Sequence, residues 1–371
     1  MNSLLTNQEM SLDKLSSLRQ TIKDLGWHRK ATRKILFELM IHLTLALGGI
    51  CIFIISENLL VQVLGMLVST LGSLGVSTNT HTSSHYATSE KKWVNELLTY
   101  FGYPVFLGLS ATYWWNKHVV VHHPNPNIMG VDKDADIMPW FALNQEQVNQ
   151  TSGISHLYYS KLQWLVFPFA LALNSFSVQK DGWRYLLRHL RDPALRKPAH
   201  WIDLGVLLLH WTVWIFLPMI FFPTTTVLSF YLLRLGLMSY AMYCAFAPAH
   251  YPVEAVCAQS HNTKADYLMR QTATTVNFHW GFICRFLCSG VDYQIEHHLF
   301  PEISHVYYPQ ISQLVKQYCQ KHGYPYRSLS WGAAIWKSWM VLRSPKPVAS
   351  DLEIFGHSTV PMVTTSTAAR N

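Results

Sequence analysis

The clearest pattern along the chain is a set of four long apolar runs that form two pairs. Leu39–Ile55 and Leu59–Val76 are separated by three polar residues, and Leu204–Phe222 and Val227–Ala247 are separated by an uncharged turn. Each run is close to the roughly 20 residues that a helix needs to cross a bilayer. The pattern therefore predicts an all-α integral membrane protein with four transmembrane helices, arranged as two hairpins.

The distribution of basic residues predicts which side of the membrane the hairpins begin on. The first 34 residues are polar and basic, without the apolar core of a signal peptide. A second basic stretch precedes the second hairpin; it contains Arg184, Arg188, Arg191, Arg196 and Lys197. Because cytoplasmic segments next to membrane spans are enriched in Lys and Arg, we expect both hairpins to begin and end on the cytoplasmic side.

Two shorter apolar stretches are predicted to lie at the membrane interface. Leu162–Val178 is interrupted by Pro168, and Phe101–Trp115 is interrupted by Pro104, so neither matches a full span. Arg234 lies inside the fourth run, where a charge is costly, so it is either functional or reaches back toward the near surface.

The same pattern gives a domain organisation. We expect a cytoplasmic N-terminal segment at 1–35, a membrane domain with a cytoplasmic helical cap at 36–330, and a C-terminal segment at 331–371 whose end is disordered.

Composition agrees with residence in a membrane. Half of the residues are hydrophobic and only 13% are charged, whereas soluble domains carry about 25% charged residues. The excess of 29 Lys and Arg over 21 Asp and Glu would by itself suit anionic lipid, nucleic acid or an acidic protein. The four apolar runs favour membrane lipid as the surrounding partner, and we expect no role in nucleic-acid binding. The six cysteines have no disulfide or zinc-finger spacing and are expected to be reduced.

The candidate chemistry lies in the histidines, which number 19. Three groups stand out: HTSSH at 81–85, HVVVHH at 118–123, and QIEHH at 294–298. Each group follows a predicted membrane exit on the same side, so the three can meet. Histidines four residues apart share one face of a helix, whereas adjacent histidines diverge by about 100° and suit two different metals. The pattern predicts a dimetal centre with the ligands His81, His85, His118, His122, His123, His297 and His298, and with His250 as an eighth.

Two other interpretations of these histidines stay open. Any single one could be a packing or surface residue of a histidine-rich protein. The set could also belong to a membrane metal transporter or metal-binding receptor, although transport histidines should line a path through the bilayer, whereas these gather at helix ends on one side.

The residues around the third group resemble the membrane fatty acid desaturase family. The most specific stretches are YQIEHHLFP at 293–301 and QTATTVNF at 271–278, and the resemblance extends from about Leu59 to Tyr326. Gln294 begins the third group, as in the front-end or acyl-lipid branch of the family.

The resemblance implies two iron ions, with O2 as co-substrate, bound by the eight histidines above. It implies that Gln294 binds a metal weakly or holds a metal-bound water. Asp134 and Asp136 match the family's acidic motif, and Glu296 lies within the third group; such residues hold imidazoles in the correct tautomer. As an alternative, Glu296 faces solvent.

The activity that the resemblance implies is O2-dependent desaturation of a fatty acyl chain linked to lipid, acyl carrier protein or coenzyme A. The first group reads HTSSH where the family usually has HDxGH, so Thr82 replaces an acidic residue. Hydroxylation, acetylenic bond formation and oxidative decarboxylation therefore stay open. No HPGG haem motif occurs in the 371 residues, so we expect a separate electron donor, such as ferredoxin or cytochrome b5 with its reductase. The expected location is the bacterial inner membrane or the endoplasmic reticulum, with the active site on the cytoplasmic face.

Overall fold

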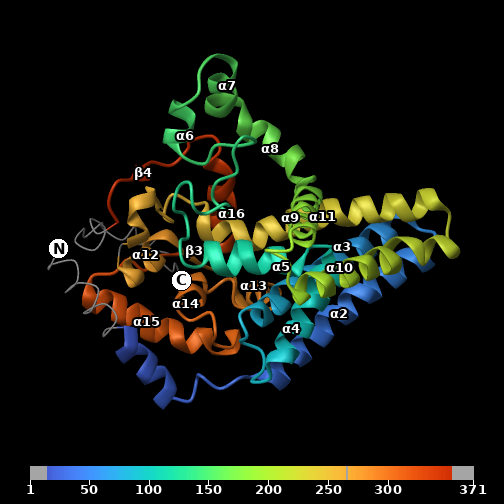
Figure 1. Cartoon of the computed structure of the whole chain (residues 1–371), viewed down its shortest axis with the longest axis horizontal. Helices are drawn as coiled ribbons and strands as arrows, with labels where there is room; N and C mark the ends of the chain where they lie inside the picture. The colour runs from blue at the N-terminus through green and yellow to red at the C-terminus, as the bar shows by residue number, and fades with distance from the viewer. Residues whose placement is uncertain (1–14, 265, 353–371) are drawn as a thin grey trace, which may run out of the picture.

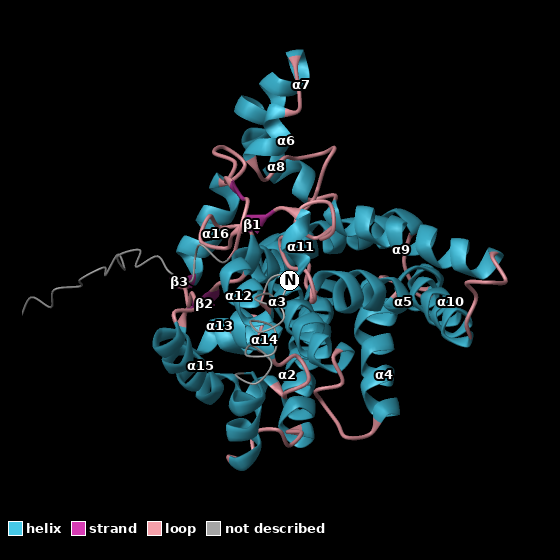
Figure 2. Ribbon diagram, turned by 60° about the vertical axis from the view of Figure 1, so that its left-hand side comes forward, coloured by secondary structure: helices cyan, strands magenta, loops and turns pink. Residues whose placement is uncertain are grey.

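The chain forms an extended bundle of helices joined to a compact helical cap (Figures 1 and 2). The computed structural model describes residues 15–264 and 266–352. The expected disorder at the C-terminal end lies outside the described residues. Four helical stretches are long and apolar enough to cross a membrane: Thr32–Ile55, Leu59–Ser84, Pro198–Ile220 and Thr224–His250. They confirm the expected all-α membrane architecture with two hairpins.

The first hairpin consists of α2 (Thr32–Ile55) and α3 (Leu59–Ser84), which pack tightly along their length. Glycines permit this close approach: a Cβ on Gly49 would lie 2.4 Å from Gly65 O, and one on Gly72 would lie 2.3 Å from Ala46 N. Small residues let transmembrane helices approach closely, which increases their van der Waals contact. The close pairing fixes the position of α3, which extends beyond its apolar run and ends at the first histidine group.

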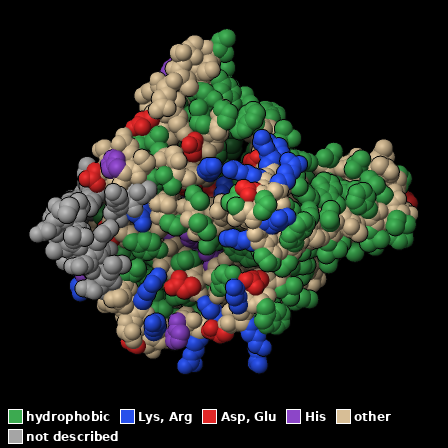
Figure 3. Space-filling view, viewed as in Figure 1, with side chains coloured by type: hydrophobic (Ala, Val, Ile, Leu, Met, Phe, Trp, Pro, Cys, Tyr) green, Lys and Arg blue, Asp and Glu red, His purple; other side chains and the backbone are tan. Residues whose placement is uncertain are grey.

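The second hairpin consists of α10 (Pro198–Trp211), which continues through η4 (Thr212–Phe216) and η5 (Pro218–Ile220), and α11 (Thr224–His250). The four long helices form the arm at the right of Figure 1, and hydrophobic side chains cover much of its surface (Figure 3). Exposed leucines on this arm include Leu59, Leu60 and Leu232. Such a surface is suited to lipid.

The chain between the hairpins first makes a short helical hairpin of its own. It runs through α4 (Lys92–Tyr100) and η1 (Phe101–Leu107), reverses, and returns through α5 (Ala111–Trp114) and η2 (Trp115–His122). The reversal occurs at Gly108, which has φ +72°. This conformation strongly favours glycine, and a Cβ at this position would also lie 2.6 Å from Gln179 Nε2.

Side chains from neighbouring helices satisfy the carbonyls at the end of η1. Gln179 Nε2 donates to Leu107 O at 2.7 Å, and Arg234 donates to Phe106 O at 2.7 Å. The Arg234 guanidinium also lies 3.8 Å from the centre of the Trp214 ring. Arg234 is 2% exposed, so it is turned into the fold and does not reach back to the surface. Its charge interacts with the carbonyl end of a helix, where a cation is favourable.

The chain then forms α6 (Gln145–Asn149), α7 (Gly153–Leu157), η3 (Tyr158–Leu162), α8 (Gln163–Leu171) and α9 (Asn174–Arg191). The expected interfacial stretch at 162–178 is divided between α8 and α9, with a break at 172–173. None of these helices meets the criteria of length and apolarity for a span among the described residues. The structure therefore agrees with an interfacial position for this stretch.

The cap follows α11. Its elements are β1 (Cys257–Ala258), η6 (Ser260–Lys264), α12 (Tyr267–Thr274), β2 (Asn277–His279), α13 (Gly281–Cys288), α14 (Gln294–Leu299), η7 (His305–Tyr307), α15 (Tyr308–His322), β3 (Ser328–Ser330), α16 (Trp331–Met340) and β4 (Val348–Ala349). The strands form two parallel pairs, β1 with β4 and β2 with β3. Helix α16 also packs against α11. The part of the C-terminal segment up to residue 352 is thus attached to the cap and to the membrane helices.

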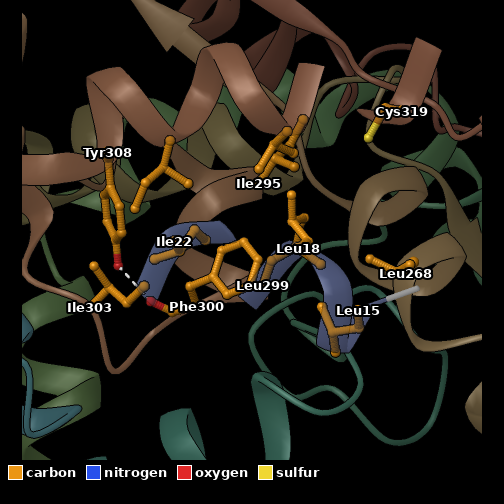
Figure 4. Packing of buried hydrophobic residues seen from close by; sticks show 12 residues of the cluster. Leu15, Leu18, Ile22, Leu268, Ile295, Leu299, Phe300, Ile303, Tyr308 and Cys319 are labelled. Carbon is orange, nitrogen blue, oxygen red and sulfur yellow. Dashed lines mark hydrogen bonds between the residues drawn. The ribbon is translucent and has the colours of Figure 1, made fainter. Parts of the chain in front are cut away.

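A hydrophobic core packs against α14, the helix that carries His297 and His298, and Figure 4 shows the residues of this core. Ile295 and Leu299 of α14 pack with Leu18 and Ile22 from the helical residues 15–24. Tyr308 at the start of α15 donates a hydrogen bond to Phe300 O at 3.2 Å. The N-terminal segment thus contributes to the structure that supports α14.

Candidate metal centre

The first histidine group lies at the end of α3. His81 is in the last turn of this helix, and His85 is its C-terminal cap. The two ring centres lie 5.0 Å apart, as expected for residues one helical turn apart on the same face. Because α3 is one continuous helix from Leu59, its packing in the membrane hairpin determines where both imidazoles lie.

The second group lies at the end of η2. His118 and His122 are on this π-helix, and His123 is its C-terminal cap. The N-terminus of the same helical stretch is held by Asp203 of α10, whose carboxylate accepts hydrogen bonds from Ser110 Oγ, Ala111 N, Thr112 N and Thr112 Oγ1 at 2.5–3.0 Å. A carboxylate at this position satisfies the free N–H groups of the helix and interacts well with its dipole.

The third group lies on α14, between the cap core and the other histidines. Its apolar residues Ile295 and Leu299 pack in the core, whereas His297 and His298 join the histidines from α3 and η2. All three segments therefore end in one buried volume, although they are far apart in the sequence.

The histidines form two adjacent sets of converging nitrogen atoms. The larger set contains His81, His85, His118, His123 and His297, and the smaller set contains His122, His250 and His298. Within each set, the candidate ligand atoms all lie within 4.8 Å of one another. His118 Nε2 lies 2.7 Å from His81 Nε2 and 3.1 Å from His123 Nε2.

These contacts fit metal ions better than they fit hydrogen bonding among imidazoles alone. A neutral imidazole has one N–H and one lone pair, so a nitrogen that faces two others cannot form good hydrogen bonds with both. Buried ring nitrogens that have no partner among the described residues include His85 Nε2, His298 Nε2 and His250 Nδ1. Convergent, unpaired and buried nitrogens are the donors that a cation requires, so the residues present fit a metal centre.

The protonation states agree with this role. Burial lowers the pKa of His85 to about 3. Burial, together with the neighbouring imidazoles, also lowers the pKa values of His118, His123, His297 and His298 well below the usual range. These rings are therefore neutral at physiological pH, and only the neutral form has a lone pair available for a metal.

Three polar side chains orient individual imidazoles. His122 Nδ1 donates to Asp132 Oδ2 at 2.9 Å, and His298 Nδ1 donates to Gln271 Oε1 at 2.9 Å. The Tyr308 hydroxyl lies 3.4 Å from His297 Nδ1. These bonds leave Nε2 of His122 and of His298 free to face the centre.

Sequence reasoning missed Asp132 and Gln271. Asp132 is only two residues from Asp134, and Gln271 begins the QTATTVNF stretch, but no sequence signal distinguishes these residues from their polar neighbours. Burial lowers the pKa of His122, but the Asp132 carboxylate together with Asp134 outweighs burial, so the net shift of this pKa is upward.

The three acidic residues expected to support the imidazoles, Asp134, Asp136 and Glu296, have different partners. Asp134 forms an ion pair with Lys117 at 2.5 Å, and its carboxylate lies 3.8 Å from His122 Nδ1 and 3.9 Å from His118 Nδ1. Asp136 accepts a hydrogen bond from Gln147 Nε2 at 2.7 Å and lies outside the candidate metal groups of the described chain.

Glu296 is fully buried, so the alternative that it faces solvent is wrong. Its carboxylate accepts hydrogen bonds from Asn277 Nδ2 at 2.8 Å and from the Tyr326 hydroxyl at 3.0 Å. Burial raises its pKa to about 7. Glu296 therefore joins α14 to β2 and to the segment that follows α15.

Gln294 and His250 lie side by side in the smaller set. Gln294 Nε2 lies 2.8 Å from His250 Nε2, and Gln294 Oε1 is buried without a partner among the described residues. This buried amide oxygen is a further potential oxygen donor beside His250. The His250 carbonyl is held by Asn127 Nδ2 and Lys346 Nζ, both at 2.8 Å.

The comparison with known protein families agrees with this geometry. The model of the family described as "Fatty acid desaturase" matches residues 57–330, which include all three histidine groups and His250. The chain belongs to the fatty acid desaturase family. This membership confirms the expected resemblance.

Several curated members of the fatty acid desaturase family are similar to this chain. The Delta(5) fatty acid desaturase fat-4 of Caenorhabditis elegans is 28% identical over 73% of this chain. The Delta(8)-fatty-acid desaturase 2 of Arabidopsis thaliana is 26% identical over 69% of it. The chain spans about three fifths of the length of these two relatives, 61% and 58%. The sn-1 linoleoyl-lipid 6-desaturase of Arthrospira platensis is 26% identical over 80% of this chain and 82% of its own length.

Proposed function

We propose that this protein is an O2-dependent fatty acyl desaturase that introduces a carbon–carbon double bond into an acyl chain. The observation that carries the proposal is the pair of adjacent histidine sets, five and three imidazoles, buried where the membrane helices meet the cap. The names of the similar relatives support it, because all three describe desaturases that act on fatty acids or on a lipid-linked acyl group.

We further propose that the two sets bind two iron ions. His81, His85, His118, His123 and His297 would hold one ion, and His122, His250 and His298, with Gln294 beside them, would hold the other. Ions bound there would supply the oxygen chemistry that removes hydrogen from an unactivated methylene group. Asp132 and Gln271 would keep the ring nitrogens of His122 and His298 in the tautomer that faces the metal.

Apolar rings next to the metal centre would keep water away from it and contact the acyl chain. The Trp114 ring stacks on His118 with 4.3 Å between ring centres, and Phe246 lies edge-on to His81 at 5.6 Å. An acyl methylene held against such rings would lie close to the metals in a region of low polarity. The proposed substrate is an acyl chain carried by lipid, acyl carrier protein or coenzyme A.

The proposed partner is a separate electron donor, and the proposed location follows from the charge distribution. Electrons would come from a separate redox protein, such as ferredoxin or cytochrome b5 with its reductase. The basic residues near α9 and the start of α10 would place the metal centre on the cytoplasmic side of the bacterial inner membrane or the endoplasmic reticulum.

Other functions receive less support. A hydroxylase, acetylenase or oxidative decarboxylase of fatty acyl chains could use the same residues, and the reaction product distinguishes them. A metal transporter or receptor fits less well, because the described histidine sets lie together at helix ends and not along a path between the spans.

The decisive experiment is expression of the chain with a compatible electron donor in a host with a known acyl profile. We expect an acyl product that has lost two hydrogen atoms relative to its substrate. A product with one added oxygen atom would indicate hydroxylation, and a terminal alkene with one carbon fewer would indicate decarboxylation. An unchanged profile with an inserted, iron-loaded protein and a verified donor would contradict the proposal. Separate measurement of lipid-bound and free acyl pools would identify the carrier.

A further inference from the structure

Thr82 differs from Thr70 and Thr80 of α3 in the partner of its hydroxyl. Thr70 and Thr80 each donate to a carbonyl four residues earlier in the same helix, both at 2.8 Å, whereas Thr78 donates to Leu287 O of α13 at 2.6 Å. Thr82 Oγ1 instead lies 3.0 Å from Nδ1 of His305, which is 223 residues away in the sequence. The end of α3 is therefore connected to η7 of the cap by a side-chain contact.

Glu38 of α2 holds the other ring nitrogen of His305. Its carboxylate lies 2.9 Å from His305 Nε2. An ionised carboxylate only accepts hydrogen bonds, so His305 Nε2 donates to Glu38, and His305 Nδ1 shares a hydrogen bond with the Thr82 hydroxyl. The three side chains thus form a continuous chain from Thr82 through His305 to Glu38.

This chain of side chains contacts the last turn of α3, between the two histidines of the first group. Thr82 lies between His81 and His85, in the last turn of α3. Tyr86, which follows His85, has a positive φ of 57°. Carbonyls of this turn already have N–H partners, because Ala87 N donates to Thr82 O and Trp115 Nε1 donates to Ser84 O, both at 3.1 Å. The Thr82 side chain adds a separate contact, to the cap. Thr82 and His305 are 5% and 8% exposed, which shields their contact from water.

The neighbouring residue of the cap strengthens the same connection. Ser304 Oγ donates to Ala87 O at 2.5 Å and accepts from Ala31 N at 3.0 Å. Residues 304 and 305 therefore contact both the start of the first hairpin and the turn after the first histidine group.

We propose that His305, held by Glu38, is a positioning residue that fixes the end of α3 through Thr82 and so determines how tightly His81 and His85 hold their metal. This inference rests on the proposed role of these two histidines as ligands. Thr82, where the sequence departs from the family pattern, would then connect the end of α3 to His305. His305 acts through Thr82 and is not itself a ligand.

The test compares the loss of iron from variants of the full chain. Thr82→Val keeps the shape of the side chain but removes the hydroxyl, and Thr82→Ser keeps the hydroxyl. Thr70→Val is the matched control, because it removes a hydroxyl bonded only within α3. Purified proteins are loaded anaerobically with iron(II), and the transfer of iron to a chelator that changes colour on binding it is followed over time. In a separate experiment, the unfolding temperature of each metal-free protein is measured.

We expect Thr82→Val to lose iron from the larger set about tenfold faster than wild type. Thr82→Ser and Thr70→Val should behave like wild type. Glu38→Met should also speed the loss, and combining it with Thr82→Val should add little, because both changes break one chain.

Equal iron retention in Thr82→Val and Thr70→Val would overturn the inference, as would equal loss from Thr82→Val and Thr82→Ser. Additive effects of Glu38→Met and Thr82→Val would show that the two residues act separately, and would also overturn it. If wild-type protein binds no iron at all, the proposed metal centre fails instead, so the two failures are distinguishable.

Discussion

Asp132 and His122 form a buried hydrogen bond of 2.9 Å, in which the imidazole Nδ1 donates to the carboxylate. Asp132 is 1% exposed, and its carboxylate also accepts from the backbone N–H groups of Asn127 and Asp134 at 2.8 and 2.9 Å. The loop after η2 is therefore folded around this carboxylate, and the same group orients a candidate metal ligand.

Replacing Asp132 by Asn should weaken metal binding in the smaller histidine set. The amide oxygen can still accept from His122, but the negative charge that makes this imidazole a better donor is lost. We expect a decrease in metal affinity of about 10–100-fold, measured by iron titration with a competing chelator. Asp136→Asn is the matched control from the same loop, because Asp136 is bonded to Gln147. Equal affinities for the two variants would contradict the assigned role of Asp132.

Replacing His298 by Ala should remove one metal ion and leave the other. His298 belongs to the smaller set, whereas the five histidines of the larger set remain. Elemental analysis should give about two irons per chain for wild type and about one for the variant, which should be inactive but still inserted in the membrane. His189→Ala changes a histidine outside both sets and should retain both ions. One zinc and no iron in active wild-type protein would rule out the two-iron centre.

Replacing Asp203 by Ala should destabilise the helix that carries the second histidine group. The change removes the acceptor of hydrogen bonds from Ser110 and from the N–H groups of Ala111 and Thr112, all of which are buried near it. We expect a loss of roughly 2–4 kcal/mol, measured as a lower unfolding temperature in detergent, together with weaker iron retention. The exposed Asp192, which accepts from Ala194 N alone at 2.9 Å, provides the control Asp192→Ala. That control should cost about 1 kcal/mol or less.

Asp292 should make the metal-free protein less stable as the pH rises. Burial raises the pKa of this carboxyl from 3.8 to about 7. A carboxyl that binds its proton more tightly in the folded state contributes stability at low pH, and this contribution is lost between about pH 4 and pH 7. Asp292→Asn should reduce this dependence by roughly 2–4 kcal/mol, measured by thermal unfolding at several pH values. Asp181→Asn, which removes a carboxyl whose side chain is 44% exposed, is the matched control.

The electron donor should be recognised through the basic surface of α9 and the loop that follows it. The exposed cations of this surface are Lys180, Arg184, Arg188, Arg191, Arg196 and Lys197. With an acidic donor, coupling should weaken as salt rises, and the double change Arg184→Glu with Arg188→Glu should raise the KM for the donor and flatten its salt dependence. Lys316→Glu on α15 is a control with the same charge change on another element. Turnover of this chain with reduced nicotinamide alone would contradict the need for a separate donor.

The membrane architecture and the candidate metal-binding histidines could be predicted from local patterns in the sequence. The spans can be predicted because a run of roughly 20 apolar residues is a local property of the sequence, and a helix of this length crosses the hydrocarbon core of a bilayer. His81 with His85, and His118 with His122, were predicted to pair because helical spacing places residues four apart on one face. Each prediction depends on residues that are neighbours along the chain.

The division of these histidines into two sets, and the side chains that support them, depend on contacts between segments far apart in the sequence. The assignment of His123 to the larger set and of His122 to the smaller one depends on how η2 is rotated against α3 and α14. Asp132 and Asp134 lie two residues apart in an irregular loop, where no periodicity indicates which carboxylate reaches an imidazole. The contact of Thr82 with His305 joins residues 223 positions apart, because it depends on the packing of the cap against the membrane hairpin and not on any local pattern.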